Sequence, residues 1–159
     1  MGYYHTAQLC INGHMITDKF DSHSELSKPF CPKCGARTIT NCPSCNAPIH
    51  GDYDCGIPVI GAPYHIDSYC YACGNPYPWT ESAIKNATLI IEESEELSDT
   101  LKSSMIETLP DVITETPSTN LAVVRMKKCL ASAGKFTADA LRQFVIDFGC
   151  ELAKKSCGL

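Results

Sequence analysis

Four short clusters of cysteine and histidine in the first half of the chain constrain its fold more than any other feature. Three clusters follow the pattern Cys-x-x-Cys, and one follows Cys-x-x-x-His. Their members are Cys10 with His14, Cys31 with Cys34, Cys42 with Cys45, and Cys70 with Cys73. A Cys-x-x-Cys turn places two sulfurs on one side of a tight loop, at the separation of two corners of a zinc tetrahedron. These eight ligands predict two structural Zn2+ ions per chain.

The residue after each Cys-x-x-Cys turn supports this prediction. Gly35 and Gly74 follow two of the turns, and Asn46 follows the third. These residue types adopt a left-handed backbone conformation most readily, which turns backbone N–H groups toward the sulfurs. Such donors disperse the negative charge of metal-bound thiolates. A redox dithiol would instead require a strand–helix–strand pattern around the cysteines, and the sequence does not show one.

The sequence leaves two pairings of the clusters open. In the sequential arrangement, the first two clusters bind one metal and the last two bind the other, as in two consecutive zinc ribbons. In the interleaved arrangement, which is typical of RING domains, clusters one and three share a metal. Local closure costs less chain entropy and favours the sequential arrangement. Antiparallel strands are then expected at Met15–Thr17 and at 36–40.

The eleven cysteines are expected to be reduced. The first residues lack the basic end and apolar run of a secretory signal, and no stretch approaches the roughly 18 apolar residues of a membrane span. A cytoplasmic location without membrane attachment is therefore expected, and paired cysteines in such a protein are better explained as metal ligands than as disulfides.

The sequence changes character near Trp79. Residues 1–79 hold eight of the cysteines and all five histidines, which is typical of a small domain stabilised by metal. Residues 80–159 are helical in pattern. The predicted fold is therefore a small zinc-stabilised β module of two zinc ribbons (1–79), followed by an all-α helical hairpin or bundle (80–159).

Four helices are expected in the second part. Thr80 would cap the first, and Ser98 would cap a second that stops at Pro110. A third would open at Thr116-Pro117, with an apolar face of Leu121, Val124, Met126 and Leu130, and end at Gly134. A fourth would begin at Thr137 and carry one apolar stripe through Leu152. These stripes are interpreted as bundle packing, with homo-oligomer formation through the helical region as the second interpretation.

No enzyme activity is predicted. All eight metal-binding positions are filled by Cys or His, whereas a catalytic zinc keeps one position for water. The sequence His50-Gly51-Asp52 before Cys70 departs from a zinc-deaminase motif, which needs glutamate and a proline before the later cysteine. Cys55, His50 and His65 are interpreted as spare residues of the second ribbon loop.

Charge argues against nucleic acid as the main partner. The net charge is -5, and residues 1–79 hold only Lys19, Lys28, Lys33 and Arg37 against six acidic residues. Nucleic-acid binders usually gain their affinity from an excess of basic residues. Aromatic residues near the turns are instead candidates for a protein interface: Tyr53, Tyr64, Tyr69, Tyr71, Tyr77 and Trp79.

The order of the motifs resembles a bacterial family of unknown function that joins N-terminal zinc ribbons to a C-terminal helical region. The resemblance lies in Cys10 through His14, Phe30 through Gly35, Tyr69 through Gly74, and Pro78-Trp79-Thr80. It implies the fold and a bacterial origin, and no activity.

Three functions remain open from the sequence. The leading hypothesis is a non-enzymatic zinc-binding adaptor that mediates protein–protein interaction with an unknown partner. The first alternative is a nucleic-acid-binding zinc-ribbon protein. The second is a RING-like component of a bacterial protein-conjugation pathway, which depends on interleaved metal pairing.

Overall fold

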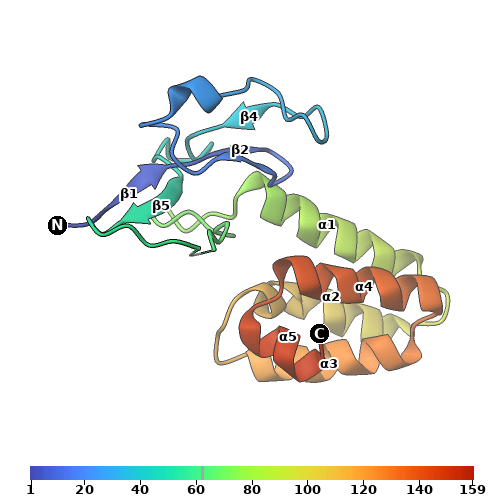
Figure 1. Cartoon of the computed structure of the whole chain (residues 1–159). Helices are drawn as coiled ribbons and strands as arrows, with labels where there is room; N and C mark the ends of the chain where they lie inside the picture. Colours follow the sequence, from blue (N-terminus) through green and yellow to red (C-terminus); the bar gives the residue numbers. More distant parts are fainter. Residues whose placement is uncertain (62) are drawn as a thin grey trace. The chain divides into compact units, whose positions relative to one another are not determined.

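The computed structural model describes residues 1–61 and 63–159, and the chain divides into two compact units, Met1–Glu81 and Ser82–Leu159. This division lies two residues beyond the expected boundary between residues 79 and 80. The first unit contains short strands and the ligand turns, whereas the second is helical, in agreement with the expected fold class (Figure 1).

The described residues of the first unit form two small antiparallel sheets. In one, β2 (Gln8–Cys10) lies between β3 (Met15–Thr17) and β4 (Thr38–Ile39). The strand expected at Met15–Thr17 is confirmed, and the one expected at 36–40 is shortened to two residues. A single 3-10 turn, η1 (Ser24–Leu26), lies between β3 and β4.

The second sheet was not predicted. It pairs β1 (Tyr3–Thr6) with β5 (His50–Asp54), a segment that the sequence analysis placed in the loop of the second ribbon. Alternating polar residues and a glycine hide the strand pattern of β5. The rings of His50 and Tyr53 lie against that of Tyr4 across the sheet. Asp54 lies 4.0 Å from His5 of β1, and Asp52 pairs with Lys19 outside the sheet.

The core of the first unit is small, since its buried apolar side chains outside the ligands are Ala7, Leu9, Ile49, Tyr77 and Trp79 among the described residues. The indole Nε1 of Trp79 donates to the carbonyl of Asp67 at 2.9 Å. Helix α1 (Pro78–Glu93) begins two residues before the expected cap, Thr80. The hydroxyl of Thr80 instead donates to the carbonyl of Ser68 at 2.7 Å and fixes the start of the helix to the preceding turn.

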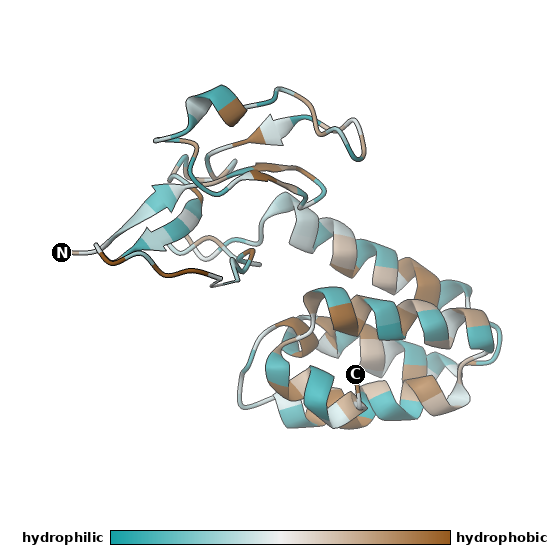
Figure 2. Cartoon of the chain, viewed as in Figure 1, coloured by the Kyte–Doolittle hydropathy of each residue, from teal (hydrophilic) through white to brown (hydrophobic). Residues whose placement is uncertain are grey.

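In the second unit, α2 (Asp99–Ile113), α3 (Thr119–Ser132), α4 (Lys135–Phe148) and α5 (Glu151–Cys157) pack together, with α3 in contact with the other three. Ser98 caps α2 as predicted, because its hydroxyl accepts from the N–H of Leu101 at 3.3 Å. Figure 2 shows hydrophobic and hydrophilic residues mixed along each helix, as expected for amphipathic helices. The largest fully buried apolar side chains of α2, α3 and α4 are Met105, Leu109, Val112, Met126, Leu141 and Val145.

Three helix boundaries differ from the prediction. Pro110 does not end α2, because its carbonyl still accepts from the N–H of Thr114 at 3.2 Å and the last turn buries Val112 and Ile113. Helix α3 begins at Thr119, after the expected Thr116-Pro117 start. Helix α4 begins at Lys135, so Thr137 is not its cap but a buried residue within it.

Two apolar stripes also differ from the prediction. On α3, Met126 is buried as predicted, but Leu121 and Val124 are exposed, and the buried face is completed by Ala122, Val123 and Cys129. The stripe expected to continue through Leu152 is interrupted at Gly149 and Cys150, where the N–H of Cys150 donates to the carbonyl of Val112 at 2.9 Å. The remaining residues form the separate helix α5. Among the described residues, no helix is sufficiently long and apolar to cross a lipid bilayer.

Candidate metal centres

The three Cys-x-x-Cys turns fold identically. In each, the N–H of the residue after the second cysteine donates to the carbonyl of the first cysteine at 2.8 Å. That residue is Gly35, Asn46 or Gly74, with φ of 73°, 63° and 73°. The left-handed conformation expected at these positions is therefore confirmed. It is the reason that these positions hold glycine or asparagine, since other L-residues pay a steric penalty there.

The structure brings the eight candidate ligands into two groups among the described residues. Cys10, His14, Cys31 and Cys34 form the first, and Cys42, Cys45, Cys70 and Cys73 form the second. In each group the ligand atoms lie within 4.8 Å of one another. The grouping is the sequential one, so the interleaved alternative, on which the RING-like hypothesis depended, does not describe this chain.

The spacing of the ligand atoms fits a tetrahedral metal ion. Zinc–sulfur bonds of about 2.3 Å place two sulfurs about 3.8 Å apart. Cys10 and Cys34 place their sulfurs 3.7 Å apart in the first group. In the second group, the sulfurs of Cys45 and Cys70 are separated by 3.7 Å, and those of Cys42 and Cys73 by 3.9 Å. A disulfide would need about 2.05 Å, so these cysteines are free thiols arranged around a common centre.

The imidazole of His14 faces the first centre through Nδ1. This nitrogen lies 3.5 Å from the sulfur of Cys10 and 3.6 Å from that of Cys31. Nδ1 is therefore the nitrogen that would bind a metal. The backbone N–H of His14 donates to the sulfur of Cys10 at 3.3 Å, and the side-chain amide of Asn12 donates to that of Cys34 at 3.4 Å. Both contacts favour the thiolate form.

Without a metal, the sulfurs within each group differ in acidity. The N–H of Ala36 and the amide of Asn12 lower the pKa of Cys34 to about 6. Burial raises the pKa of Cys70, but the N–H groups of Ala72 and Cys73 outweigh it, and the pKa falls to about 6. The N–H of Ala47 lowers the pKa of Cys45, whereas desolvation and the neighbouring sulfurs raise it to about 12. Metal binding would therefore release protons from the remaining thiols.

One buried polar atom also points to a metal at the second group. Among the described residues, the hydroxyl of Tyr77 is the buried side-chain oxygen or nitrogen without a hydrogen-bond partner. Burial and the neighbouring sulfur of Cys70 raise the pKa of this phenol, so it stays protonated and available as a donor. A metal-bound thiolate at Cys70 is a strong acceptor for it. The residues present therefore fit a thiolate-bound metal ion.

His50, Cys55 and His65 were predicted to be spare residues of a loop, but His50 is the first residue of β5. None belongs to either ligand group. His50 is stacked between two tyrosines, with ring centroids 4.1 Å from Tyr4 and 3.8 Å from Tyr71. It therefore connects β1 and β5 to the turn between Cys70 and Cys73.

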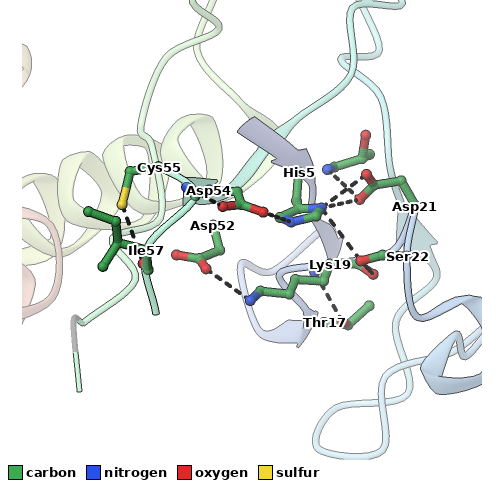
Figure 3. A network of polar contacts seen from close by, with 11 residues as sticks. His5, Thr17, Lys19, Asp21, Ser22, Asp52, Asp54, Cys55 and Ile57 are labelled. Atoms are coloured by element: carbon green, nitrogen blue, oxygen red, sulfur yellow. Dashed lines mark hydrogen bonds and ion pairs between the residues drawn. The ribbon is translucent and has the colours of Figure 1, made fainter. Parts of the chain in front are cut away.

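A polar network that no sequence pattern predicted surrounds His5, which is buried. Its Nδ1 lies 3.0 Å from the carboxylate of Asp21, and its Nε2 lies 4.0 Å from that of Asp54 (Figure 3). Asp21 also accepts from the N–H of Thr6 at 2.9 Å, and Lys19 pairs with Asp52 at 3.1 Å. No local motif marks these contacts, because the partners are far apart in the sequence.

Comparison with known families places the chain in one of them. A model of a bacterial family, described as an uncharacterized protein conserved in bacteria (DUF2321), matches residues 3–157. The chain belongs to this family. The DUF2321 match covers residues of both units, including all four ligand turns. No curated protein and no solved structure matched the chain.

Proposed function

We propose that the chain is a non-enzymatic adaptor in which two structural Zn2+ ions stabilise a rigid module that binds another protein. Thiolate and imidazole ligands suit zinc, and four protein ligands complete its preferred tetrahedron. The metal ions would then stabilise the fold, and residues on the protein surface would bind the partner.

The observation that carries this proposal is an exposed apolar segment directly after β5. Ile57, Val59 and Ile60 are 72%, 65% and 98% exposed. Figure 2 shows this segment as a strongly hydrophobic stretch of the first unit. Clustered exposed aliphatic side chains are unfavourable in water and commonly mark a protein interface. Acidic residues beside this segment, described below, disfavour nucleic acid as the partner.

Site-specific photo-crosslinking in the native bacterial host tests the proposal. A photoreactive residue replaces Ile60 in the full chain, and a matched control carries it at Leu26, which is half-exposed on η1. We expect one discrete protein adduct at position 60, none at position 26, and a lower yield when Ile57 and Val59 are changed to serine. Adducts that nuclease removes, or equal adducts at both positions, would overturn the adaptor function.

A further inference from the structure

A cavity of about 960 Å³ lies beside the exposed apolar segment. Its walls come from β5 and the segment that follows it. The other lining residues are Tyr4, Asp18, Lys19, Pro63, Tyr64, His65 and Asp67. Its volume is in the range of sites that bind small-molecule ligands. The aromatic rings on its walls are those of Tyr4, Tyr53, Tyr64 and the two histidines His50 and His65.

The charge of this cavity is unbalanced. Four aspartates line it against a single lysine among the described residues, and Lys19 is already paired with Asp52 at 3.1 Å. Asp54 accepts from the N–H of Gly56 at 2.7 Å and lies 4.0 Å from His5. Figure 3 shows Asp52 and Asp54 between the Cys55–Ile57 segment and the network around His5.

The other two carboxylates, those of Asp18 and Asp67, make no hydrogen bond or ion pair with the described residues. Desolvation raises the pKa of Asp67, so its negative charge is stabilised less than that of a carboxylate in water. Desolvation raises the pKa of Tyr64, and the charges of Asp67 and Asp18 raise it further. Tyr64 therefore lies in the field of both carboxylates, with its hydroxyl donating to the carbonyl of His50.

A ligand that fits this cavity should carry a positive charge with apolar groups next to it. A cation beside an aromatic ring and unpaired carboxylates gains from both. The aliphatic side chains of Ile57 and Val59, which line the same cavity, would pack against apolar groups next to that cation. Phosphate groups would be repelled, so charge complementarity favours a peptide over a nucleic acid.

We propose that this cavity receives an arginine or lysine side chain from an exposed segment of the partner protein, with flanking apolar residues on Ile57 and Val59. This inference rests on the proposed adaptor function and names the chemistry that the partner presents. The partner segment is basic and aliphatic, and its charged side chain enters between Tyr64 and the two unpaired carboxylates.

Capped fluorescent pentapeptides of the form Ala-Leu-X-Leu-Ala test the proposal on the zinc-loaded full chain by fluorescence anisotropy. X is arginine, lysine, citrulline or glutamate, and citrulline keeps the shape of arginine without its charge. We expect the arginine or lysine peptide to bind about tenfold more tightly than the citrulline peptide, and more weakly at high salt.

Matched variants locate the binding site. Asp67→Asn and Asp18→Asn should each weaken the basic peptide about fivefold, which is typical for the loss of one charge partner. Glu25→Gln, which removes an equal charge outside the cavity, should leave binding unchanged. Equal metal content in all variants would show that the fold is intact.

The outcomes separate this inference from the proposed function. Equal binding of the citrulline and arginine peptides, no binding of the basic peptides at millimolar concentration, or full binding by Asp67→Asn would overturn the cavity assignment. If the crosslink at position 60 persists in those cases, the adaptor function stands without it. If the basic peptides bind but no partner crosslinks, the proposed function fails and the cavity remains a site for basic groups.

Discussion

Single residues supply the hydrogen-bond donors that face the sulfurs of each ligand group. In the first group, Asn12 and the N–H of His14 donate to sulfur. In the second group, the buried hydroxyl of Tyr77 lies beside Cys70. A site with four cysteines carries more negative charge than one with three, so the loss of one donor should matter more in the second group.

Tyr77→Phe should therefore weaken metal binding at the second group by about tenfold, because partners of metal ligands typically contribute 10–100-fold. The measurement is chelator competition on cobalt-substituted protein. Both groups give thiolate-to-metal absorption bands, and the visible d–d bands distinguish the four-sulfur second group from the first, which has three sulfurs and an imidazole. Tyr53→Phe removes an equal hydroxyl from an exposed ring and serves as the control. Unchanged bands and unchanged metal release in Tyr77→Phe would show that the hydroxyl makes no bond to Cys70.

The two clusters of candidate ligands and the left-handed residues beside them could be predicted because ligand spacing and turn geometry are local properties. The partners of His5 could not, because Asp21 and Asp54 become neighbours only after the chain folds. The same holds for His50, whose stacking on Tyr4 and Tyr71 joins three separate segments.

Among the secondary-structure elements, the β1–β5 sheet is the least expected. Helix α2 differs from its prediction in another way. A proline normally ends a helix, so the sequence predicted an end at Pro110. Burial of Val112 and Ile113 nevertheless extends α2 beyond Pro110. The break between α4 and α5 was equally hidden, because the apolar spacing continues across Gly149 while the N–H of Cys150 bonds to α2. Tertiary contacts overrode local preference in both helices.

Asp21→Ala should destabilise the first unit by about 1–3 kcal/mol, because it leaves buried His5 and the N–H of Thr6 without their acceptor. Glu25→Ala, which removes an exposed carboxylate that pairs with exposed His23, should leave the free energy of unfolding nearly unchanged. Denaturant unfolding with excess zinc measures both changes. Equal effects of the two substitutions would mean that the His5 network does not stabilise β1.

The pH dependence of this contribution follows from the pKa of Asp21. Desolvation would raise that pKa, but the N–H of Thr6 and the ring of His5 lower it below 3.8. A carboxyl whose pKa is lower in the folded state stabilises fully above its unfolded value and loses that contribution as the pH falls through the folded value. Measurement at pH 7 therefore records the whole effect of Asp21.

At the scale of the whole molecule, the two units rely on different sources of stability. The first has few buried apolar side chains beyond its ligands, whereas the second buries an apolar face on each of α2, α3 and α4. A small apolar core seldom stabilises a domain without a metal or disulfide. Metal binding should therefore control the folding of the first unit and have little effect on the helices.

Protein purified without added metal should contain two zinc ions per chain, and Cys42→Ser should reduce this to one because the first group is retained. Strong chelator should then expose the first-unit thiols to alkylation while the helical circular dichroism signal persists. Elemental analysis and thiol counting check these outcomes. A single zinc in the wild type, or helices that unfold together with metal loss, would contradict this division.

The pairing of β1 with β5 connects the start of the chain to the segment that carries the second ligand group. β1 precedes every ligand of the first group, yet its partner strand lies in the interval between the two turns of the second group. Tyr4 extends this connection through His50 to Tyr71, inside the last turn. Residues ahead of the first ligand thus brace the second centre, so a deletion through Thr6 that spares all eight ligands would loosen the more distant metal group.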